Sequence, residues 1–116
     1  MTVSEKVFRR GDTPSLDEIR AALAPALEKG GASQAIVFGS YARGAADGYS
    51  DLDLIVVAST DRSFFERYRP FFGVRDVWRK SLDMLISTEA ELDEMLAEQR
   101  PFIEIALEEG VVIYEE

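Results

Sequence analysis

The sequence predicts an α/β or α+β fold, in which helices flank a small β-sheet. Segments whose apolar residues recur at helical spacing alternate along the chain with short, continuous apolar runs that suit buried strands. Such alternation is typical of helices packed on a sheet. With 116 residues and no internal repeat or linker, the chain is expected to form one domain, 1–116. Residues 1–14 show no clear period and form an arm, which is either loose or packed through Val3, Val7 and Phe8.

The first helix is expected to begin after Ser15, because Ser15 and Glu18 have the spacing of a capping box. Its apolar stripe consists of Leu16, Ile19, Leu23 and Leu27. Pro25 falls inside this stripe and should kink or shorten the helix, since proline lacks the backbone N–H that a helix interior uses. Gly30 and Gly31 then end the helix.

Three short apolar runs predict strands at 33–38, 52–58 and 82–86, and residues 111–114 form either a last short strand or an extended tail. Three further helices are expected at 63–72, after the capping box of Thr88 and Glu91, and at 102–109. Pro70 should end or bend the first of these, and Gly73 should close that region. Pro101 suits the first turn of the last helix, which Gly110 ends. Residues 40–46 form a turn or a short helix.

The composition excludes several kinds of active site. The chain has no cysteine, which excludes disulfides and thiolate metal sites. It has no histidine, which excludes imidazole metal sites, the Ser-His-Asp triad and the usual proton shuttle at neutral pH. A metal would therefore be bound by carboxylates, carbonyls and water, and these ligands favour a hard ion such as magnesium.

The net charge of −9 limits the partners that the chain can bind. It argues against extended nucleic-acid binding, which needs a basic face. It is compatible with a nucleotide that arrives with magnesium, and with docking on a basic protein. No apolar run is long enough to span a bilayer, and the N-terminal residues lack the apolar segment of a signal peptide. A cytoplasmic location is expected.

The acids of the stretch 39–57 are the first candidates for chemistry. Asp51 and Asp53 are two residues apart at the start of a predicted strand, so their side chains should face the same side. Two adjacent carboxylates raise each other's pKa unless a cation lies between them. Asp83 lies in an apolar run, and on a neighbouring strand it would complete a two-metal site for phosphoryl or nucleotidyl transfer. The alternatives are a solvated strand entrance capped by Ser50 and a strand-edge aspartate that stays hydrated.

A glycine-serine turn precedes these acids. Gly39 and Ser40 follow an apolar strand, where backbone N–H groups and a hydroxyl are available to an anion, or they simply end the strand. Glycine lets the chain turn and lets a phosphate come close. Arg43 either touches a phosphate or pairs with a nearby acid. Tyr41 and Tyr49 either stack on a base or shield the edge of the sheet.

These residues together resemble a known signature. The motif that is similar to that of the DNA polymerase beta-like nucleotidyltransferase superfamily consists of Gly39, Ser40, Gly44, Ser50, Asp51 and Asp53, followed by Leu-Ile-Val. Asp83, with apolar neighbours in a later strand, resembles the third acid of this superfamily. The short length and the ending PFIEIALEEGVVIYEE look most like the minimal nucleotidyltransferases (MNT proteins), and the resemblance covers nearly the whole chain.

The resemblance implies a small mixed sheet and a role for each motif residue. It implies that Gly39 and Ser40 hold the triphosphate of a nucleotide, and Arg43 and Ser50 are the further candidates for phosphate contacts. It implies that Asp51 and Asp53 bind two magnesium ions, and that Asp83 completes one metal site and helps to deprotonate the attacking hydroxyl. Members of the superfamily transfer a nucleoside monophosphate to an acceptor hydroxyl and release pyrophosphate.

The resemblance also implies a partner. Small MNT proteins are often antitoxins of HEPN-domain toxins, and some resemble adenylyltransferases that place AMP from ATP on a toxin tyrosine. The expected function is therefore metal-dependent adenylyl transfer to such a partner, with aromatics in 64–72 or 102–114 as interface candidates or as core. Two alternatives stay open: an antitoxin that binds stoichiometrically with little catalysis, and an aminoglycoside-type enzyme. A second copy of the chain could complete the acceptor pocket.

Overall fold

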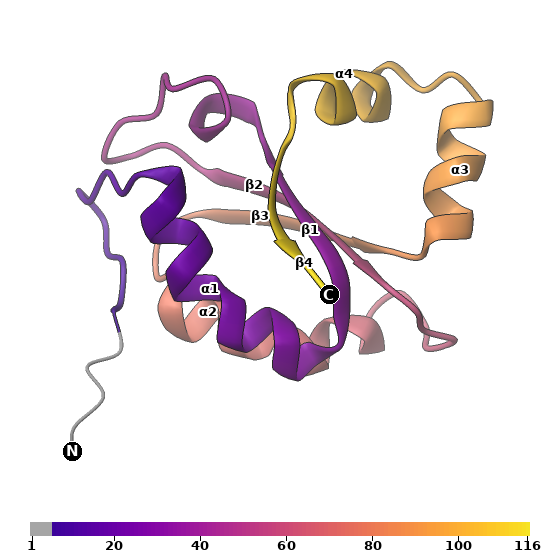
Figure 1. Ribbon diagram of the computed structural model, residues 1–116, viewed down its shortest axis with the longest axis horizontal. Coiled ribbons are helices and arrows are strands. Elements are labelled where there is room, and N and C mark those ends of the chain that lie inside the picture. The colour runs from indigo at the N-terminus through magenta and orange to yellow at the C-terminus, as the bar shows by residue number, and fades with distance from the viewer. Residues whose placement is uncertain (1–5) are drawn as a thin grey trace.

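The computed structural model describes residues 6–116 and shows a mixed four-stranded sheet with helices on both faces (Figure 1). The strands are β1 (Ala32–Phe38), β2 (Leu52–Ala58), β3 (Leu82–Ser87) and β4 (Val111–Glu115). The α-helices are α1 (Leu16–Gly30), α2 (Phe72–Val77), α3 (Glu89–Ala97) and α4 (Pro101–Glu109), and two 3-10 helices are η1 (Gly39–Tyr41) and η2 (Glu66–Phe71). The expected α+β architecture is confirmed, the three predicted strands are present, and the segment expected as a strand or an extended tail forms β4.

The order of strands across the sheet is β3-β2-β1-β4. β1 is antiparallel to both β2 and β4, whereas β2 and β3 are parallel, which makes the sheet mixed as the resemblance implied. At the end of the sheet where β1 ends and β2 begins, Asp53 of β2 lies opposite Phe38 of β1 on one side and opposite Asp83 of β3 on the other. These three side chains therefore share one face of the sheet.

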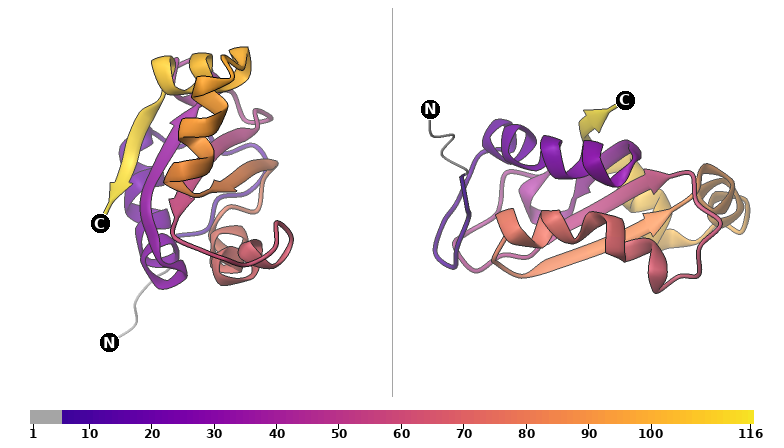
Figure 2. Two further views of the ribbon diagram at one scale, coloured as in Figure 1. Left: turned by 90° about the vertical axis from the view of Figure 1, so that its right-hand side faces the viewer. Right: turned by 90° about the horizontal axis from the view of Figure 1, so that it is seen from below.

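Each face of the sheet is covered by one pair of helices. In Figure 1, α1 and α2 lie below the sheet, and α3 and α4 lie above and beside it; Figure 2 shows the same layers from two other sides. Alternate residues of β2 divide between the two cores, because successive strand side chains point to opposite faces. Leu54 packs with α1 and α2, and Ile55 packs with α3 and α4. Among residues 6–116, no helix is long and apolar enough to cross a membrane.

Helix α1 follows its sequence signals at both ends but passes through its proline. The Ser15 hydroxyl accepts the Glu18 backbone N–H, and Gly31 adopts a left-handed cap with φ of 88°. Pro25 does not shorten the helix, which continues to Gly30. The buried side chains of Leu23 and Leu27 lie on either side of the proline. Their burial offsets the cost of the hydrogen bond that proline removes.

The segment around Pro70 differs from the predicted helix 63–72. Pro70 lies inside η2, and α2 then continues through Gly73 to Val77, so the expected closure at Gly73 is wrong. Helix α2 persists because Val74 is fully buried in the core that α1 also lines. A Cβ on Gly73 would lie 3.3 Å from the Ala26 Cβ of α1, so the small residue allows the two helices to pack closely.

The N-terminal arm packs against the rest of the domain through Phe8. Its backbone N–H donates to the Val77 carbonyl at 2.8 Å, and its carbonyl accepts the Arg79 N–H at 2.9 Å. The Phe8 ring lies 5.5 Å from the Trp78 ring and is 2 % exposed. Val3, the other end of the expected arm, lies outside the described residues.

Replacing Phe8 with leucine should lower the free energy of unfolding by about 1–2 kcal/mol, because a buried aromatic contact with Trp78 is lost. Chemical denaturation measures this change. Phe65→Leu is the matched control, since Phe65 is 85 % exposed and should lose less than about 0.5 kcal/mol. Equal effects of the two substitutions would show that the arm contributes nothing to the core.

Candidate active site

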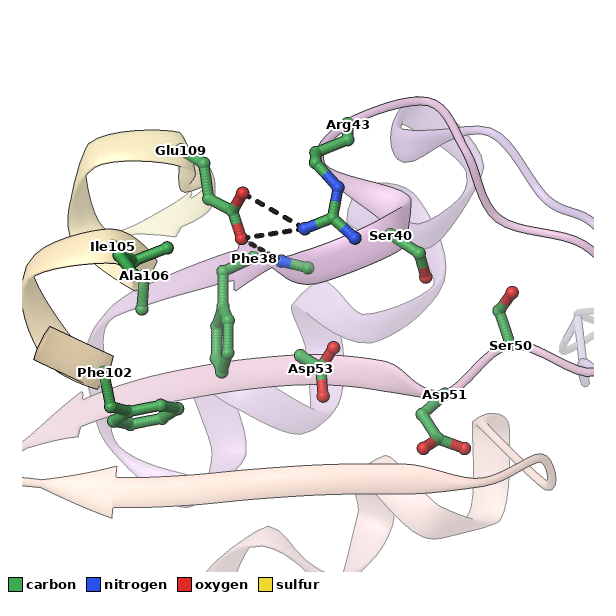
Figure 3. Close-up of a pocket in the computed structure, with 11 residues that line it drawn as sticks. Phe38, Ser40, Arg43, Ser50, Asp51, Asp53, Phe102, Ile105, Ala106 and Glu109 are labelled. Atoms are coloured by element: carbon green, nitrogen blue, oxygen red, sulfur yellow. Dashed lines mark hydrogen bonds and ion pairs between the residues drawn. The ribbon is translucent and has the colours of Figure 1, made fainter.

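A pocket of about 420 Å³ opens where β1 ends and β2 begins, beside α4 (Figure 3). Its volume lies within the range of small-molecule sites. Its walls are formed by Phe38, Gly39, Ser40, Arg43, Ser50, Asp51, Asp53, Phe102, Ile105, Ala106 and Glu109. The pocket therefore combines one charged wall with one apolar wall, and six of the seven predicted site residues line it, all but Asp83.

Asp51 and Asp53 present two carboxylates to this pocket (Figure 3). Asp53 is half-buried, and burial raises the pKa of its carboxyl; the charges of Asp83 and then Asp51 raise this pKa further. The Arg43 guanidinium acts in the opposite direction and lowers the pKa of Asp53. The charges of Asp51 and Asp83 therefore both act on the carboxyl of Asp53.

Asp83 is placed differently from the other acids. It lies on β3 directly across from Asp53, but its side chain is exposed and it does not line the pocket. Within residues 6–116, no group of three His, Cys, Asp or Glu side chains is arranged to hold a metal ion. The three-carboxylate metal site therefore stays a prediction.

The donor chemistry of the pocket nevertheless fits a hard divalent cation. Asp51 and Asp53 supply only carboxylate oxygens, which are the ligands that magnesium prefers. Besides burial, repulsion from Asp83 and Asp51 raises the pKa of Asp53, and a cation between Asp51 and Asp53 would relieve the repulsion between these two carboxylates. These two residues could hold magnesium, with Asp83 available at the adjacent strand.

Gly39 brings the backbone into contact with this acidic site. Its φ of 72° lies in the left-handed region that favours glycine. A Cβ built on Gly39 would overlap the Oδ2 atom of Asp53, so no larger residue fits while Asp53 keeps its position. Its backbone N–H donates to the Glu109 Oε1 atom at 2.9 Å.

Arg43 pairs with an acid in this structure. Its Nη1 atom lies 3.2 Å from Oε1 and 3.1 Å from Oε2 of Glu109 (Figure 3). The Gly39 N–H, and secondly Arg43, lower the pKa of the Glu109 carboxyl. The alternative that Arg43 pairs with a nearby acid is therefore observed, and one carboxylate accepts hydrogen bonds from two groups that are candidates for binding nucleotide phosphates.

The remaining candidate residues, two serines and two tyrosines, have different roles. Ser40 lines the pocket. The Ser50 hydroxyl accepts the Asp47 N–H at 2.8 Å and donates to the Asp47 carboxylate at 3.2 Å, which shapes the loop that leads to the acids. Tyr41 is buried and its hydroxyl lies 2.9 Å from Lys80 Nζ, whereas Tyr49 is exposed under Arg10. Neither tyrosine lines the pocket.

Sequence reasoning missed the wall that α4 contributes. Phe102, Ile105, Ala106 and Glu109 all line the pocket. Their spacing of three, one and three residues places them on one helix face, which was the available signal. The strand residue Phe38 completes this wall, and its ring meets that of Phe102 at 5.5 Å in an edge-on arrangement.

The chain is similar to a known protein family, to a named protein and to a solved structure. A family model described as a nucleotidyltransferase domain matches residues 19–113. A Methanocaldococcus jannaschii protein named "Putative protein adenylyltransferase" is 32 % identical over 71 residues, which are 61 % of this chain and 76 % of that protein. A crystal structure titled as a "putative nucleotidyltransferase" from Sulfolobus solfataricus is 18 % identical, with a TM-score of 0.49 and coverage of 93 % of this chain and 94 % of that one.

Proposed function

The chain belongs to the nucleotidyltransferase domain family and is a transferase, and we propose that it transfers AMP from ATP to an acceptor hydroxyl. The observation that carries this proposal is the pocket itself. It places Asp51 and Asp53 beside the Gly39 N–H and the Arg43 guanidinium, so groups suited to a metal and groups suited to phosphates face one space.

In the proposed reaction, each residue acts on a stated part of the substrates. The Gly39 N–H, the Ser40 hydroxyl and Arg43 would bind the phosphates, and Asp51 and Asp53 would hold magnesium. Magnesium, when bound, neutralises charge on the triphosphate. The acceptor oxygen bonds to the α-phosphorus, the bond to the bridging oxygen breaks, and pyrophosphate leaves. Asp83 takes the proton of the acceptor hydroxyl.

We further propose that the acceptor is a tyrosine of a HEPN-domain toxin and that the chain acts as its antitoxin. The M. jannaschii relative, named as a protein adenylyltransferase, supports a protein acceptor. The net charge of −9 suits docking on a basic surface. The candidate interface segments 64–72 and 102–114 both carry exposed aromatic side chains. Phe64, Phe65 and Phe72 are exposed around η2, and Phe102 is exposed on α4.

A second candidate is an antitoxin that acts by stoichiometric binding. The exposed phenylalanines Phe64, Phe65 and Phe72 favour it, because none of them lines the pocket and a surface of this kind suits a protein contact. The two candidates differ in one consequence. If binding alone neutralises the partner, variants that lack the pocket acids will still neutralise it in cells.

Incubation with α-labelled ATP, magnesium and a HEPN-domain partner should transfer label to a partner tyrosine and release unlabelled pyrophosphate. γ-Labelled ATP is the matched control and should leave the partner unlabelled, because AMP transfer keeps only the α-phosphate. Mass spectrometry locates the modified residue. Label from the γ-position would instead indicate phosphoryl transfer, and no label on any partner or small-molecule acceptor would contradict the proposed function.

A further inference from the structure

We propose that Glu109 is an internal occupant of the phosphate subsite, which the nucleotide must displace in order to bind. This inference rests on the proposed function, because it identifies the subsite as one for nucleotide phosphates. It assigns a specific role to a residue that the motif does not include. Glu109 thereby sets the affinity of the pocket for polyphosphates.

The contacts of Glu109 are those that a phosphate would make. Its carboxylate accepts the Gly39 N–H at 2.9 Å and lies 3.1 and 3.2 Å from Arg43 Nη1. Carboxylate and phosphate oxygens accept charge-assisted hydrogen bonds from the same donors. Figure 3 shows the Glu109 and Arg43 side chains pointing toward each other. A phosphate bound by either donor would compete with this carboxylate.

The surroundings of Glu109 otherwise disfavour its charge. Glu109 is the last residue of α4, where the helix dipole is negative, and the last turn of this helix holds no basic residue. It also lines the same pocket as the carboxylates of Asp51 and Asp53. The two donors of the subsite therefore hold Glu109 against repulsion from its own helix and from the acids.

Glu109 is also able to leave the subsite. Its side chain is 23 % exposed, so the carboxylate can turn toward solvent. A protein whose binding-competent state is only partly populated shows a correspondingly reduced affinity. Removing the charge of Glu109 should therefore free both donors and strengthen phosphate binding.

The test compares Glu109→Gln with Glu108→Gln, which removes the same charge from the same helix outside the pocket. Calorimetry with inorganic tripolyphosphate and with ATP, each with magnesium, measures the Kd. Glu109→Gln should lower both Kd values about tenfold, which is the effect of losing one charge-assisted competitor, and Glu108→Gln should change them less than twofold. Glu109→Asp, which withdraws the carboxylate and keeps the charge, should also bind more tightly than the unmodified chain.

Unchanged or weaker binding of tripolyphosphate by both Glu109 variants would overturn the inference and make Glu109 a support of the Gly39 backbone. The absence of tripolyphosphate binding by every variant would overturn it too. Tighter binding of tripolyphosphate without AMP transfer to any acceptor would uphold the inference and contradict the proposed function. AMP transfer by the unmodified chain, together with no gain of tripolyphosphate affinity in the Glu109 variants, would uphold the proposed function and contradict the inference.

Discussion

Replacing Asp53 with asparagine is expected to lower the rate of AMP transfer about a thousandfold. Asp53 is the acid that lies between Asp51, two residues before it, and Asp83 on the adjacent strand. Asparagine keeps the shape of the side chain but removes the charge that would bind magnesium. Single-turnover transfer of α-labelled AMP measures the loss. Thermal unfolding with added magnesium provides a second measurement, because the cation should stabilise the unmodified chain and have little effect on Asp53→Asn.

Asp93→Asn is the matched control for this substitution. Asp93 is exposed on α3 and does not line the pocket, so its variant should keep the transfer rate and the magnesium effect. Asp51→Asn should lose transfer in the same way as Asp53→Asn. Full activity of a folded Asp53→Asn variant would remove this residue from the proposed mechanism.

The stability of Asp53→Asn should change in the opposite direction to its activity. The folded state raises the pKa of the Asp53 carboxyl, through burial and then through the charges of Asp83 and Asp51. The native state therefore keeps this proton to a higher pH than the unfolded chain, and the free energy of unfolding falls as pH rises between the two pKa values. Asparagine does not titrate, so it removes this fall in the free energy of unfolding. Without magnesium, Asp53→Asn should unfold at a higher temperature than the unmodified chain at neutral pH, and the difference should shrink below the ordinary pKa of aspartate.

The sequence predicted the sheet and the motif because both depend on neighbouring residues. The strand predicted at 52–58 matches β2 residue for residue, since its apolar run is buried on both faces and is bounded by polar residues. The capping boxes at Ser15 and Thr88 have the predicted hydrogen bonds. The pairing of Asp53 with Asp83 follows from two strands lying side by side in register.

What the sequence did not predict depends on contacts between distant segments. Glu109 meets Gly39 across 70 positions, and only the packing of α4 beside the end of β1 brings them together. Helix α2 passes Gly73 because of its contact with α1, which no local signal encodes. The sequence left open whether Asp83 joins a metal site or stays hydrated at a strand edge, and the position of β3 at the edge of the sheet leaves its carboxylate exposed. Tertiary packing overrides local signals at each of these positions.

Gly39→Ala should reduce AMP transfer by at least about a hundredfold, because it disturbs the backbone and the acid at once. Alanine at a φ of 72° is strained by about 1–2 kcal/mol. The new Cβ would also overlap Asp53 Oδ2, so either the strand end or the carboxylate must move. A displacement of about 1 Å in a catalytic group is enough to cost about two orders of magnitude in rate.

Gly44→Ala separates the effect of backbone strain from the effect of the overlap with Asp53. Gly44 has nearly the same backbone conformation, with φ of 71°, but a Cβ there would meet nothing within 4 Å. Both variants should therefore lose about 1–2 kcal/mol of stability from strain, and Gly39→Ala should lose more because it also displaces Asp53. Combining Gly39→Ala with Asp53→Ala should recover the excess loss of stability, since the truncated side chain leaves room for the new Cβ. If the excess persists in the double variant, the close approach of Gly39 to Asp53 is not its cause, and the hydrogen bond from Gly39 to Glu109 becomes the contact to test.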